Sequence, residues 1–396
     1  MGSCSRARRQ GRRASPPWKP LDILKLHSRP GLQNDCWRSG APDPLRLTIA
    51  RMPVTMRAVL LEEPNGPLVQ REIPIPRPGE GEVLVRVRAC AVDQFDLSIR
   101  KGIRERATQL PHVLGHEIAG EVADLGAGVD VPEVGARVAS TLYLVCGRCR
   151  WCRRGRETIC EEFGGHVGVN VPGGYAEYVI LPARNLVSIP PHIDFPEASI
   201  LANAIGTPYH ALTARMRLSP GERLVVTGAG GGVGLHAVQI GVMLGASVMG
   251  VDLGRPKLDA ALDLGAERAI DPTTTDLGVA IRDWTGGTGA DGVLELVGPA
   301  TMPHTLRSLC KGGRMVIVGS HTGNEWALDP GEIYRNEWEI LGSRNVSVDE
   351  LRTVVELVAR GRIRPIVDGT HPLEDVELLH ERVRSGTVIG RDVLVP

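Results

Sequence analysis

The sequence predicts an α/β protein with two differently built parts. Short apolar runs separated by Gly and Pro extend from about residue 56 to residue 190, which is typical of a β-rich part. From residue 224 onward, short apolar runs alternate with helical stretches, as in a doubly wound parallel sheet. A chain of 396 residues is long enough for two hydrophobic cores.

The predicted elements change in pattern near residue 200. Between residues 83 and 88, valines alternate with Leu84 and two arginines, which predicts a half-buried strand. Further strands are predicted at 224–226, 247–251, 292–297, 314–318, 338–341 and 393–395, and a helix at 235–244. Ser347 and Glu350 have the spacing of a capping box, which predicts a helix that ends at Gly361.

Four cysteines lie within fifteen residues, in the spacing C-x2-C-x2-C-x7-C. They are Cys146, Cys149, Cys152 and Cys160. Tetrahedral zinc favours thiolate ligands, and one short loop with this spacing can surround a single ion. The sequence therefore predicts one bound zinc ion.

A glycine-rich turn joins the predicted strand 224–226 to the helix that follows. Glycines let the backbone approach a pyrophosphate at the positive N-terminus of a helix. The residues expected to bind it are Gly228, Gly231, Gly232, Val233 and Gly234. Asp252 follows the next strand, where it can bind an adenosine ribose and repel a 2′-phosphate. NAD(H) is therefore favoured over NADP(H), although Arg255 nearby tempers the preference.

The composition narrows the choice of partners and compartment. The formal net charge of +0 argues against a nucleic-acid or anionic-membrane surface. No apolar run approaches the roughly 20 residues of a transmembrane helix. Eight cysteines and no signal peptide favour the reducing cytoplasm. Residues 1–55 are rich in Arg and Pro and lack an apolar face, which favours a disordered or non-native extension over a targeting peptide.

Taken together, these motifs resemble the medium-chain dehydrogenase/reductase superfamily, which includes zinc alcohol dehydrogenases and quinone and enoyl-thioester reductases. The resemblance runs from about residue 56 to residue 396. It includes Gly115-His116-Glu117, the four cysteines, the glycine-rich turn and Gly390-Arg391.

The resemblance implies a GroES-like, β-rich catalytic domain over residues 56–190 and 345–396. A Rossmann dinucleotide-binding domain over residues 191–344 would interrupt it, with the active site between the two. It further implies that the four cysteines hold a structural zinc ion and that the protein forms a homodimer or homotetramer.

The catalytic zinc of alcohol dehydrogenases in this superfamily takes a Cys, the His of the Gly-His-Glu motif and a second Cys. His116 is retained, but the two cysteine positions hold Asp93 and Asn203. A carboxylate can bind zinc, whereas a neutral amide is a poor ligand for it. A second, catalytic zinc at Asp93 and His116, with Glu117 as a replacement ligand, stays open as an alternative.

The proton relay of these alcohol dehydrogenases is also altered. Its hydroxyl and imidazole positions are Phe95 and Ser98 here, and Phe95 cannot pass on a proton. The same stretch instead resembles the Asn-x-x-Asp-x-x-x-Arg-x-Gly pattern of zinc-free quinone reductases, through Asp96, Arg100 and Gly102, with Asp93 at the Asn position. The combination is similar to that of archaeal-type acryloyl-coenzyme A reductases.

The leading hypothesis is an NAD(P)H-dependent reductase that transfers a hydride to an activated C=C bond in an enoyl thioester, enone or quinone. Such a reaction needs hydride placement and an oxyanion or proton donor, but no metal. The alternative is a zinc-dependent alcohol dehydrogenase with a non-standard zinc site. A more remote one is a dinucleotide-binding protein without catalysis. The partner is a small-molecule substrate in the first two cases.

The resemblance also assigns residues to the site. The reacting centre is expected at Asp93, His116, Asn203, Asp96 and Glu117. The cofactor is expected to contact, besides the glycine-rich turn and Asp252, the residues Thr207, Lys257, Gly319 and Arg391. Three single polar residues are interpreted as surface groups, namely His321, Ser343 and Asn345.

Overall fold

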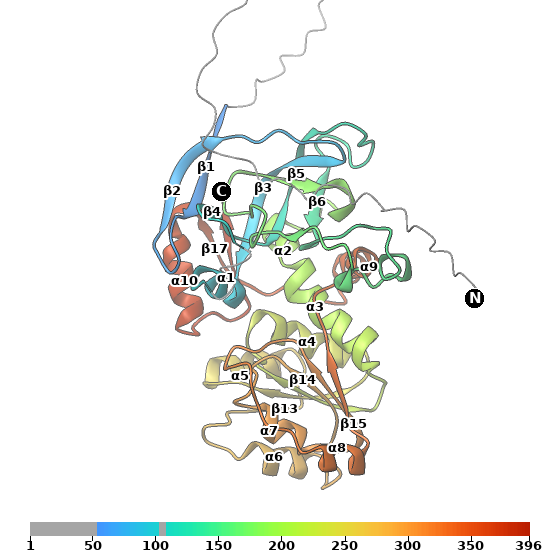
Figure 1. Ribbon diagram of the computed structural model, residues 1–396. Coiled ribbons are helices and arrows are strands. Elements are labelled where there is room, and N and C mark those ends of the chain that lie inside the picture. Colours follow the sequence, from blue (N-terminus) through green and yellow to red (C-terminus); the bar gives the residue numbers. More distant parts are fainter. Residues whose placement is uncertain (1–53, 103–107) are drawn as a thin grey trace, which may run out of the picture. The chain divides into compact units, whose positions relative to one another are not determined.

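The computed structural model describes residues 54–102 and 108–396 (Figure 1). The predicted extension therefore lies outside the described residues except for its last two positions, and Thr55 is already the first residue of strand β1. Among the described residues, none of the helices has both the length and the apolar character needed to span a bilayer.

The β-rich domain is built on two main sheets. The smaller has the order β2-β1-β4, with β1 Thr55–Leu61, β2 Leu68–Pro74 and β4 His112–Val113. The larger has the order β10-β6-β5-β3-β18-β17, with β9 also paired to β3. Its strands are β3 Glu82–Val92, β5 Glu117–Leu125, β6 Arg137–Ser140, β9 Tyr178–Pro182, β10 Leu186–Ser188, β17 Val367–Pro372 and β18 Arg391–Val395.

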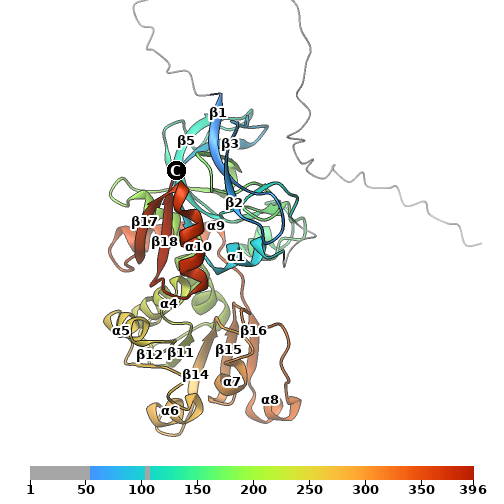
Figure 2. The same ribbon diagram turned by 90° about the vertical axis from the view of Figure 1, so that its left-hand side faces the viewer.

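The C-terminal end of the chain completes the larger sheet. Strand β18 runs antiparallel to β3, with Val393 opposite Ala91, and β17 borders it on the other side (Figure 2). The short strands β7 Tyr143–Leu144 and β8 Gly165–His166 pair beside the cysteine loop. Helices α1 Gln94–Arg100, α2 Phe195–Ser199, α9 Val348–Ala359 and α10 Val376–Arg384 belong to the same part, with 3₁₀ turns at Cys152–Arg154, Glu157–Ile159, Ala183–Asn185 and Leu373–Asp375.

A six-stranded parallel sheet forms the second domain, in the order β13-β12-β11-β14-β15-β16. Its strands are β11 Arg223–Thr227, β12 Ser247–Val251, β13 Arg268–Ile270, β14 Ala290–Glu295, β15 Leu309–Ile317 and β16 Glu339–Gly342. The connecting helices are α4 Gly232–Met243, α5 Arg255–Asp263, α6 Leu277–Trp284, α7 Met302–Leu306 and α8 Pro330–Asn336. The strand order reverses between β11 and β14, and ligands of doubly wound sheets bind at that point.

Apolar side chains cover both faces of this parallel sheet. Leu224 and Val226 of β11 join the cluster that contains α4, while Val225 joins the cluster that contains α6 and α7. This explains why the strand reads as an unbroken apolar run. A helical segment leads into the domain, with α3 Gly206–His210 between two π-helical stretches, Leu201–Ile205 and Ala211–Met216.

The predicted two-domain α/β class is confirmed, with corrections at individual elements. In the strand that was predicted to be half-buried, Leu84 is only 1% exposed, because β3 is an interior strand and alternate side chains on both of its faces pack into one apolar cluster. Helix α4 begins at Gly232, three residues before the predicted start, because the glycine-rich turn itself supplies the first helical residues. The capping box of Ser347 and Glu350 is present at the start of α9.

Candidate active site

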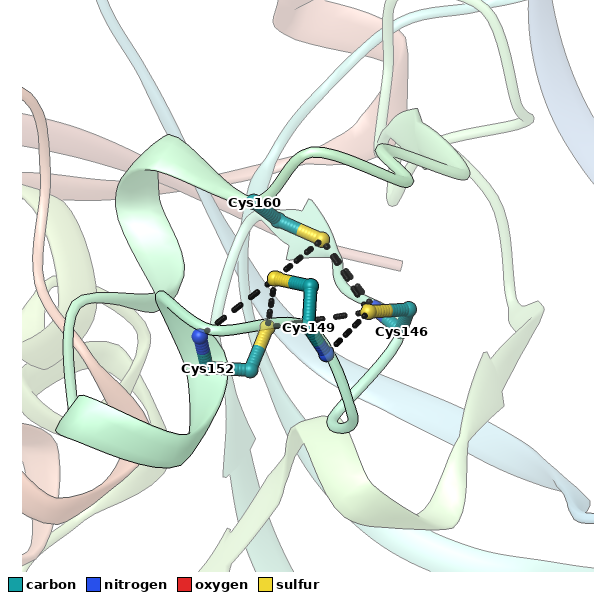
Figure 3. A group of neighbouring side chains, drawn as sticks. All are labelled: Cys146, Cys149, Cys152 and Cys160. Atoms are coloured by element: carbon teal, nitrogen blue, oxygen red, sulfur yellow. Dashed lines mark hydrogen bonds between the residues drawn. The ribbon is translucent and has the colours of Figure 1, made fainter.

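The four cysteines converge on one point in a loop of the β-rich domain (Figure 3). The Sγ atom of Cys152 lies 3.9 Å from that of Cys146 and 3.5 Å from that of Cys149. The Sγ atom of Cys160 lies 3.5 Å from that of Cys146 and 4.0 Å from that of Cys149. Four sulfurs bonded tetrahedrally to zinc at about 2.3 Å stand about 3.8 Å apart. The cluster therefore fits a single zinc ion.

Backbone N–H groups of the same loop point at these sulfurs. The N–H of Cys149 donates to Cys146 Sγ over 3.2 Å, and that of Cys146 donates to Cys160 Sγ over 3.4 Å. Such donors stabilise thiolates, which are the form that binds metal. None of the four cysteines lines the cleft described below, so their zinc would brace the loop without reaching the substrate.

Asp93 ends strand β3 and caps helix α1. Its Oδ1 accepts from the backbone N–H groups of Phe95, at 2.7 Å, and Asp96, at 3.2 Å. In return, Asp96 Oδ2 accepts from the N–H of Asp93 over 3.1 Å, which completes a capping box. One oxygen of Asp93 is thus used locally, and Oδ2 is left to face the neighbouring domain.

His116 lies between the two aspartates. Its Nδ1 is 3.1 Å from Asp96 Oδ1, and its Nε2 is 3.5 Å from Asp93 Oδ2. Burial lowers the pKa of His116, but the charges of Asp96 and Asp93 outweigh it and hold that pKa well above its usual range. The protonated ring places one N–H toward each carboxylate.

Asn203 sits in the π-helical stretch and turns its amide nitrogen toward the acids. Nδ2 donates to Asp93 Oδ2 over 3.1 Å and to Glu117 Oε1 over 2.9 Å. Its Oδ1 accepts from Thr207 Oγ1 over 2.9 Å and lies 3.3 Å from Asn345 Nδ2. Two donors on the oxygen side and two acceptors on the nitrogen side fix the orientation of the amide. A hydrogen-bond donor, and no lone pair, therefore faces Asp93 and Glu117.

Arg391, at the start of β18, neutralises part of this acidic cluster. Its Nε donates to Glu117 Oε1 over 3.0 Å and its Nη2 to Asp93 Oδ2 over 3.3 Å. Burial raises the pKa of Glu117, and Arg391 offsets this only in part. The pKa of Asp93 is held low, because His116 and Arg391 outweigh the effect of its burial. Glu117 Oε2 is buried without a hydrogen-bond partner in the structure.

These residues do not fit a four-coordinate zinc ion at the reacting centre. Three atoms could serve as ligands, namely Asp93 Oδ2, His116 Nε2 and Glu117 Oε1. The two carboxylate oxygens each already accept from both Asn203 and Arg391. Asp96, which lies in the same acid and histidine group, uses Oδ1 for His116 and Oδ2 for the N–H of Asp93. A cation here would have to displace these donors.

The glycine-rich turn is held in the shape that the sequence predicts. Gly228 has a φ of 64°, which favours glycine. A Cβ on Gly234 would lie 2.0 Å from the carbonyl oxygen of Gly228, so only glycine allows the turn to fold onto the start of α4. The first turn of α4 thereby presents free backbone N–H groups at the switch point of the sheet.

Asp252, at the end of β12, also helps to shape this turn. Its Oδ2 accepts from the N–H of Gly230 over 2.7 Å, and its Oδ1 from the N–H of Leu253 over 2.7 Å. Lys257 Nζ lies 3.9 Å from Asp252 Oδ1. A carboxylate and an ammonium group thus stand together at the position expected for an adenosine ribose.

The C-terminal strand is joined to the glycine-rich turn. Gly231 and Gly390 form an isolated parallel bridge. His236 of α4 links the same regions, since its Nδ1 donates to the carbonyl of Gly232 over 2.6 Å and its Nε2 accepts from the N–H of Ile366 over 3.1 Å. Burial lowers the pKa of His236 to about 4, so the neutral ring is the form that makes both bonds.

A cleft of about 760 Å³ brings most of the predicted site residues together. Those that line it are Asp93, His116, Asn203, Thr207, Gly228, Gly231, Gly232, Val233, Gly234, Asp252, Lys257, Gly319 and Arg391. Asp96 and Glu117 do not line it and are fully buried, so they can act only through His116, Asn203 and Arg391. They are positioning residues in this arrangement.

The interpretation of His321, Ser343 and Asn345 as surface groups was wrong for the last two, whereas His321 is exposed and also lines the cleft. Ser343 and Asn345 are 8% and 5% exposed and line the cleft, because they follow the carboxyl end of a parallel strand, where such sheets bind ligands. Sequence reasoning also missed Tyr175, whose hydroxyl donates to Asp96 Oδ2 over 3.1 Å. Tyr175 lies 79 residues beyond Asp96, and no local motif marks that contact.

Comparison with known families agrees with this architecture. Residues 79–191 match the family described as alcohol dehydrogenase GroES-like domain, and residues 232–360 match zinc-binding dehydrogenase. Among solved structures, one titled crystal structure of AibC shares 37% identity, with a TM-score of 0.81 over 86% of this chain and 96% of its own. An NAD-dependent alcohol dehydrogenase shares 33%, with a TM-score of 0.82 over 86% of this chain and 100% of its own.

The curated relatives include both alcohol dehydrogenases and acryloyl-coenzyme A reductases. An alcohol dehydrogenase of Geobacillus stearothermophilus is 35% identical over 347 residues, 86% of this chain and 99% of the relative. An acryloyl-coenzyme A reductase of Metallosphaera sedula is 31% identical over 340 residues, again 86% of this chain and 99% of the relative. With these matches to the fold and to both domain families, the chain belongs to the zinc-binding, medium-chain dehydrogenase/reductase superfamily and is an oxidoreductase.

Proposed function

We propose that the protein is an NAD(P)H-dependent reductase that transfers a hydride to an activated C=C bond of an enoyl thioester, enone or quinone. The observation that carries the proposal is the orientation of Asn203, whose amide N–H groups occupy the side of the reacting centre that faces Asp93 and Glu117. Zinc-dependent alcohol chemistry needs an electron-pair donor in that place. Reduction of a polarised alkene needs hydrogen-bond donors instead.

When bound, the nicotinamide cofactor supplies the hydride. The hydride adds to the β-carbon of the alkene, the electron pair of the C=C bond moves toward the carbonyl oxygen, and a proton completes the α-carbon. In the proposal, an N–H group of Asn203 or His116 exchanges its contact with Asp93 Oδ2 for one with the carbonyl oxygen, where negative charge develops. Thr207 and Asn345 hold the Asn203 amide in place, and Asp96 holds the His116 ring.

In the proposed reaction, Phe95 and Ser98 take no part in an alcohol proton relay. Phe95 stacks edge-on against His116, with ring centroids 5.4 Å apart. The Ser98 hydroxyl donates to the carbonyl of Gln94 over 3.0 Å, within its own helix. Neither side chain offers a proton path from the cleft to solvent.

We propose NAD(H) as the preferred cofactor and a single zinc ion, held by the four cysteines. The carboxylate of Asp252 would accept from the ribose hydroxyls and repel a 2′-phosphate. Lys257 nearby reduces the strength of that discrimination, since it offers a positive charge in the same place.

A zinc-dependent alcohol dehydrogenase is the second candidate. It is favoured by the compact group of Asp93, Asp96 and His116, whose ligand atoms lie within 4.8 Å of one another, and by the relatives named alcohol dehydrogenase. In that case zinc would displace the Asn203 amide from Asp93.

One sample of purified protein separates the two candidates. NADH oxidation is measured with enones, enoyl thioesters and aldehydes, NAD⁺ reduction is measured with alcohols, and zinc is quantified by elemental analysis. The proposal predicts turnover of an enone or enoyl thioester with one zinc per chain. Turnover of alcohols alone, with two zinc ions per chain, would contradict it.

A further inference from the structure

A continuous wall of rings lines the cleft beyond the reacting centre. Phe95 and His166 have ring centroids 5.1 Å apart, and His166 and Tyr143 have centroids 4.9 Å apart. Phe95 also contacts the ring of His116. The wall therefore begins at the reacting centre and ends at Tyr143, beside the cysteine loop. Such a surface suits a flat, unsaturated acyl group.

Arg344 closes the outer end of this wall. Its guanidinium carbon lies 4.6 Å from the ring centroid of Tyr143 and 6.0 Å from that of Phe163. Arg344 follows strand β16 and directly precedes Asn345, which contacts Asn203 at the reacting centre. Arg344 and Asn345 both line the cleft. Stacking on Tyr143 orients the guanidinium while its N–H groups stay exposed.

The charges that line the cleft do not balance on this side. Its lining acids are Asp93, which pairs with Arg391, and Asp252, which faces Lys257. Two further cations line the cleft, Arg344 and Lys101, and neither forms an ion pair with a described residue. Exposed arginines elsewhere in the described chain commonly have a partner, as in the pairs Arg148–Glu162 and Arg255–Asp259. The lining of the cleft therefore carries two positive charges that are not paired within the described residues.

We propose that Arg344, with Lys101, binds an anionic group that the substrate carries beyond its reacting C=C bond. A guanidinium binds carboxylate and phosphate oxygens through two N–H groups at once, so the group is either a carboxylate of the substrate or a phosphate of a thioester carrier. The acyl part lies along the ring wall and the anion reaches its end. This inference rests on the proposed function and names the class of substrate for the same site.

The cofactor does not account for these cations. Of the charged residues expected to contact it, Asp252 and Lys257 follow strand β12, and Arg391 pairs with Glu117 and Asp93. Arg344 instead stacks on Tyr143 and Phe163 in the β-rich domain. Arg344 thus lies on the substrate side of the reacting centre.

The test compares two pairs of probes that differ in charge. Crotonyl-coenzyme A is paired with neutral S-crotonyl-N-acetylcysteamine, and 4-oxopent-2-enoate with neutral pent-3-en-2-one. The variant is Arg344→Gln, and the matched control is Arg335→Gln. Arg335 is an exposed arginine that also stacks on a tyrosine, Tyr334, at 5.5 Å, but it does not line the cleft.

The ratio of kcat/KM for the anionic probe to that for its neutral partner is the readout. Arg344→Gln is expected to lower this ratio roughly tenfold or more in one pair, mainly through KM, as loss of a charge-assisted hydrogen bond would. The pair that responds identifies the anion as phosphate or carboxylate. Equal ratios in Arg344→Gln, Arg335→Gln and wild type would overturn the proposal.

Failure of the proposed function has a different signature. In that case wild-type protein reduces none of the four probes. Binding of coenzyme A and of 4-oxopentanoate to the protein–NADH complex is then measured by NADH fluorescence. Weaker binding of either anion to Arg344→Gln than to Arg335→Gln supports the anion site without the reaction. Equal binding to the two variants overturns it.

Discussion

Replacing Arg391 with Gln should destabilise the protein by about 3–5 kcal/mol at pH 8, the usual cost of removing one partner from a buried ion pair. The side chain of Arg391 is 10% exposed and contacts Glu117, which is fully buried, and Asp93, which is 8% exposed. Without the guanidinium, both carboxylates would lose a charged donor. Glu117 would keep the Asn203 amide, and Asp93 would keep Asn203 and His116. The free energy of unfolding is measured by urea denaturation with the zinc content held constant.

The loss should depend on pH in a defined direction. Burial raises the pKa of Glu117 in the folded protein, and Arg391 lowers it in part. A carboxyl with a raised folded pKa contributes stability that is complete below its unfolded pKa of about 4.3 and is lost as pH rises toward the folded pKa. Removing Arg391 raises that folded pKa further. The part of the deficit that comes from Glu117 should therefore be small near pH 4.5 and grow toward pH 8. The part that comes from Asp93 is present at both pH values, because His116 still holds the pKa of Asp93 low.

An exposed arginine serves as control for this experiment. Arg57 pairs with Glu177 and Glu374, and its side chain is 40% exposed. Arg57→Gln should cost only about 0–1 kcal/mol, because exposed ion pairs contribute little. A loss below about 1 kcal/mol in Arg391→Gln at pH 8, or an equal loss at both pH values, would refute the reasoning about the buried cluster.

Three further predictions test the site and its support. The double substitution Asp93→Cys with Asn203→Cys should raise bound zinc from one to two ions per chain, because it supplies two thiolates beside His116. Bound zinc is measured by elemental analysis. An unchanged zinc count would show that the ligand types at these two positions do not set the metal content. Asp252→Asn should raise the ratio of kcat/KM for NADPH to that for NADH roughly tenfold. The reason is the loss of about 1.5–3 kcal/mol from the charged hydrogen bonds between the carboxylate and the ribose hydroxyls of NADH. An unchanged ratio would show that Asp252 does not select the cofactor. His236 should cost the wild-type protein up to about 3 kcal/mol of stability as pH falls from 6.5 to 4. The imidazole takes up a proton at higher pH in the unfolded chain than in the folded protein, where its pKa is about 4. Denaturation of His236→Gln across that range should show a flatter pH dependence, and a slope equal to that of wild type would contradict the assignment.

Much of the fold was predictable because its signals are local. Strand β12 has the predicted bounds, since a short apolar run between polar residues marks a buried strand directly. Helix α9 begins where its capping box predicts. The position of Leu84 was not predictable, because its burial depends on strands β5 and β9, which pair with β3 from distant parts of the sequence.

The site also has a part that local sequence signals predict and a part that depends on distant contacts. The motif around His116 and the positions of Asp93 and Asn203 identified which residues would meet. The direction of the Asn203 amide could not be predicted, because it is set by Thr207 and by Asn345, which lies 142 residues further along the chain. Arg344 belongs to no motif, and its role follows only from the rings on which it stacks.

In the proposed reaction, the hydride goes to a C=C bond and not to a carbonyl carbon. Pent-3-en-2-one offers both acceptors in one neutral molecule, so its reduction with NADH deuterated at both C4 positions tests the claim directly. The account predicts pentan-2-one with deuterium on C4, the former β-carbon, as identified by mass spectrometry and NMR. Formation of pent-3-en-2-ol with deuterium on C2 would contradict it.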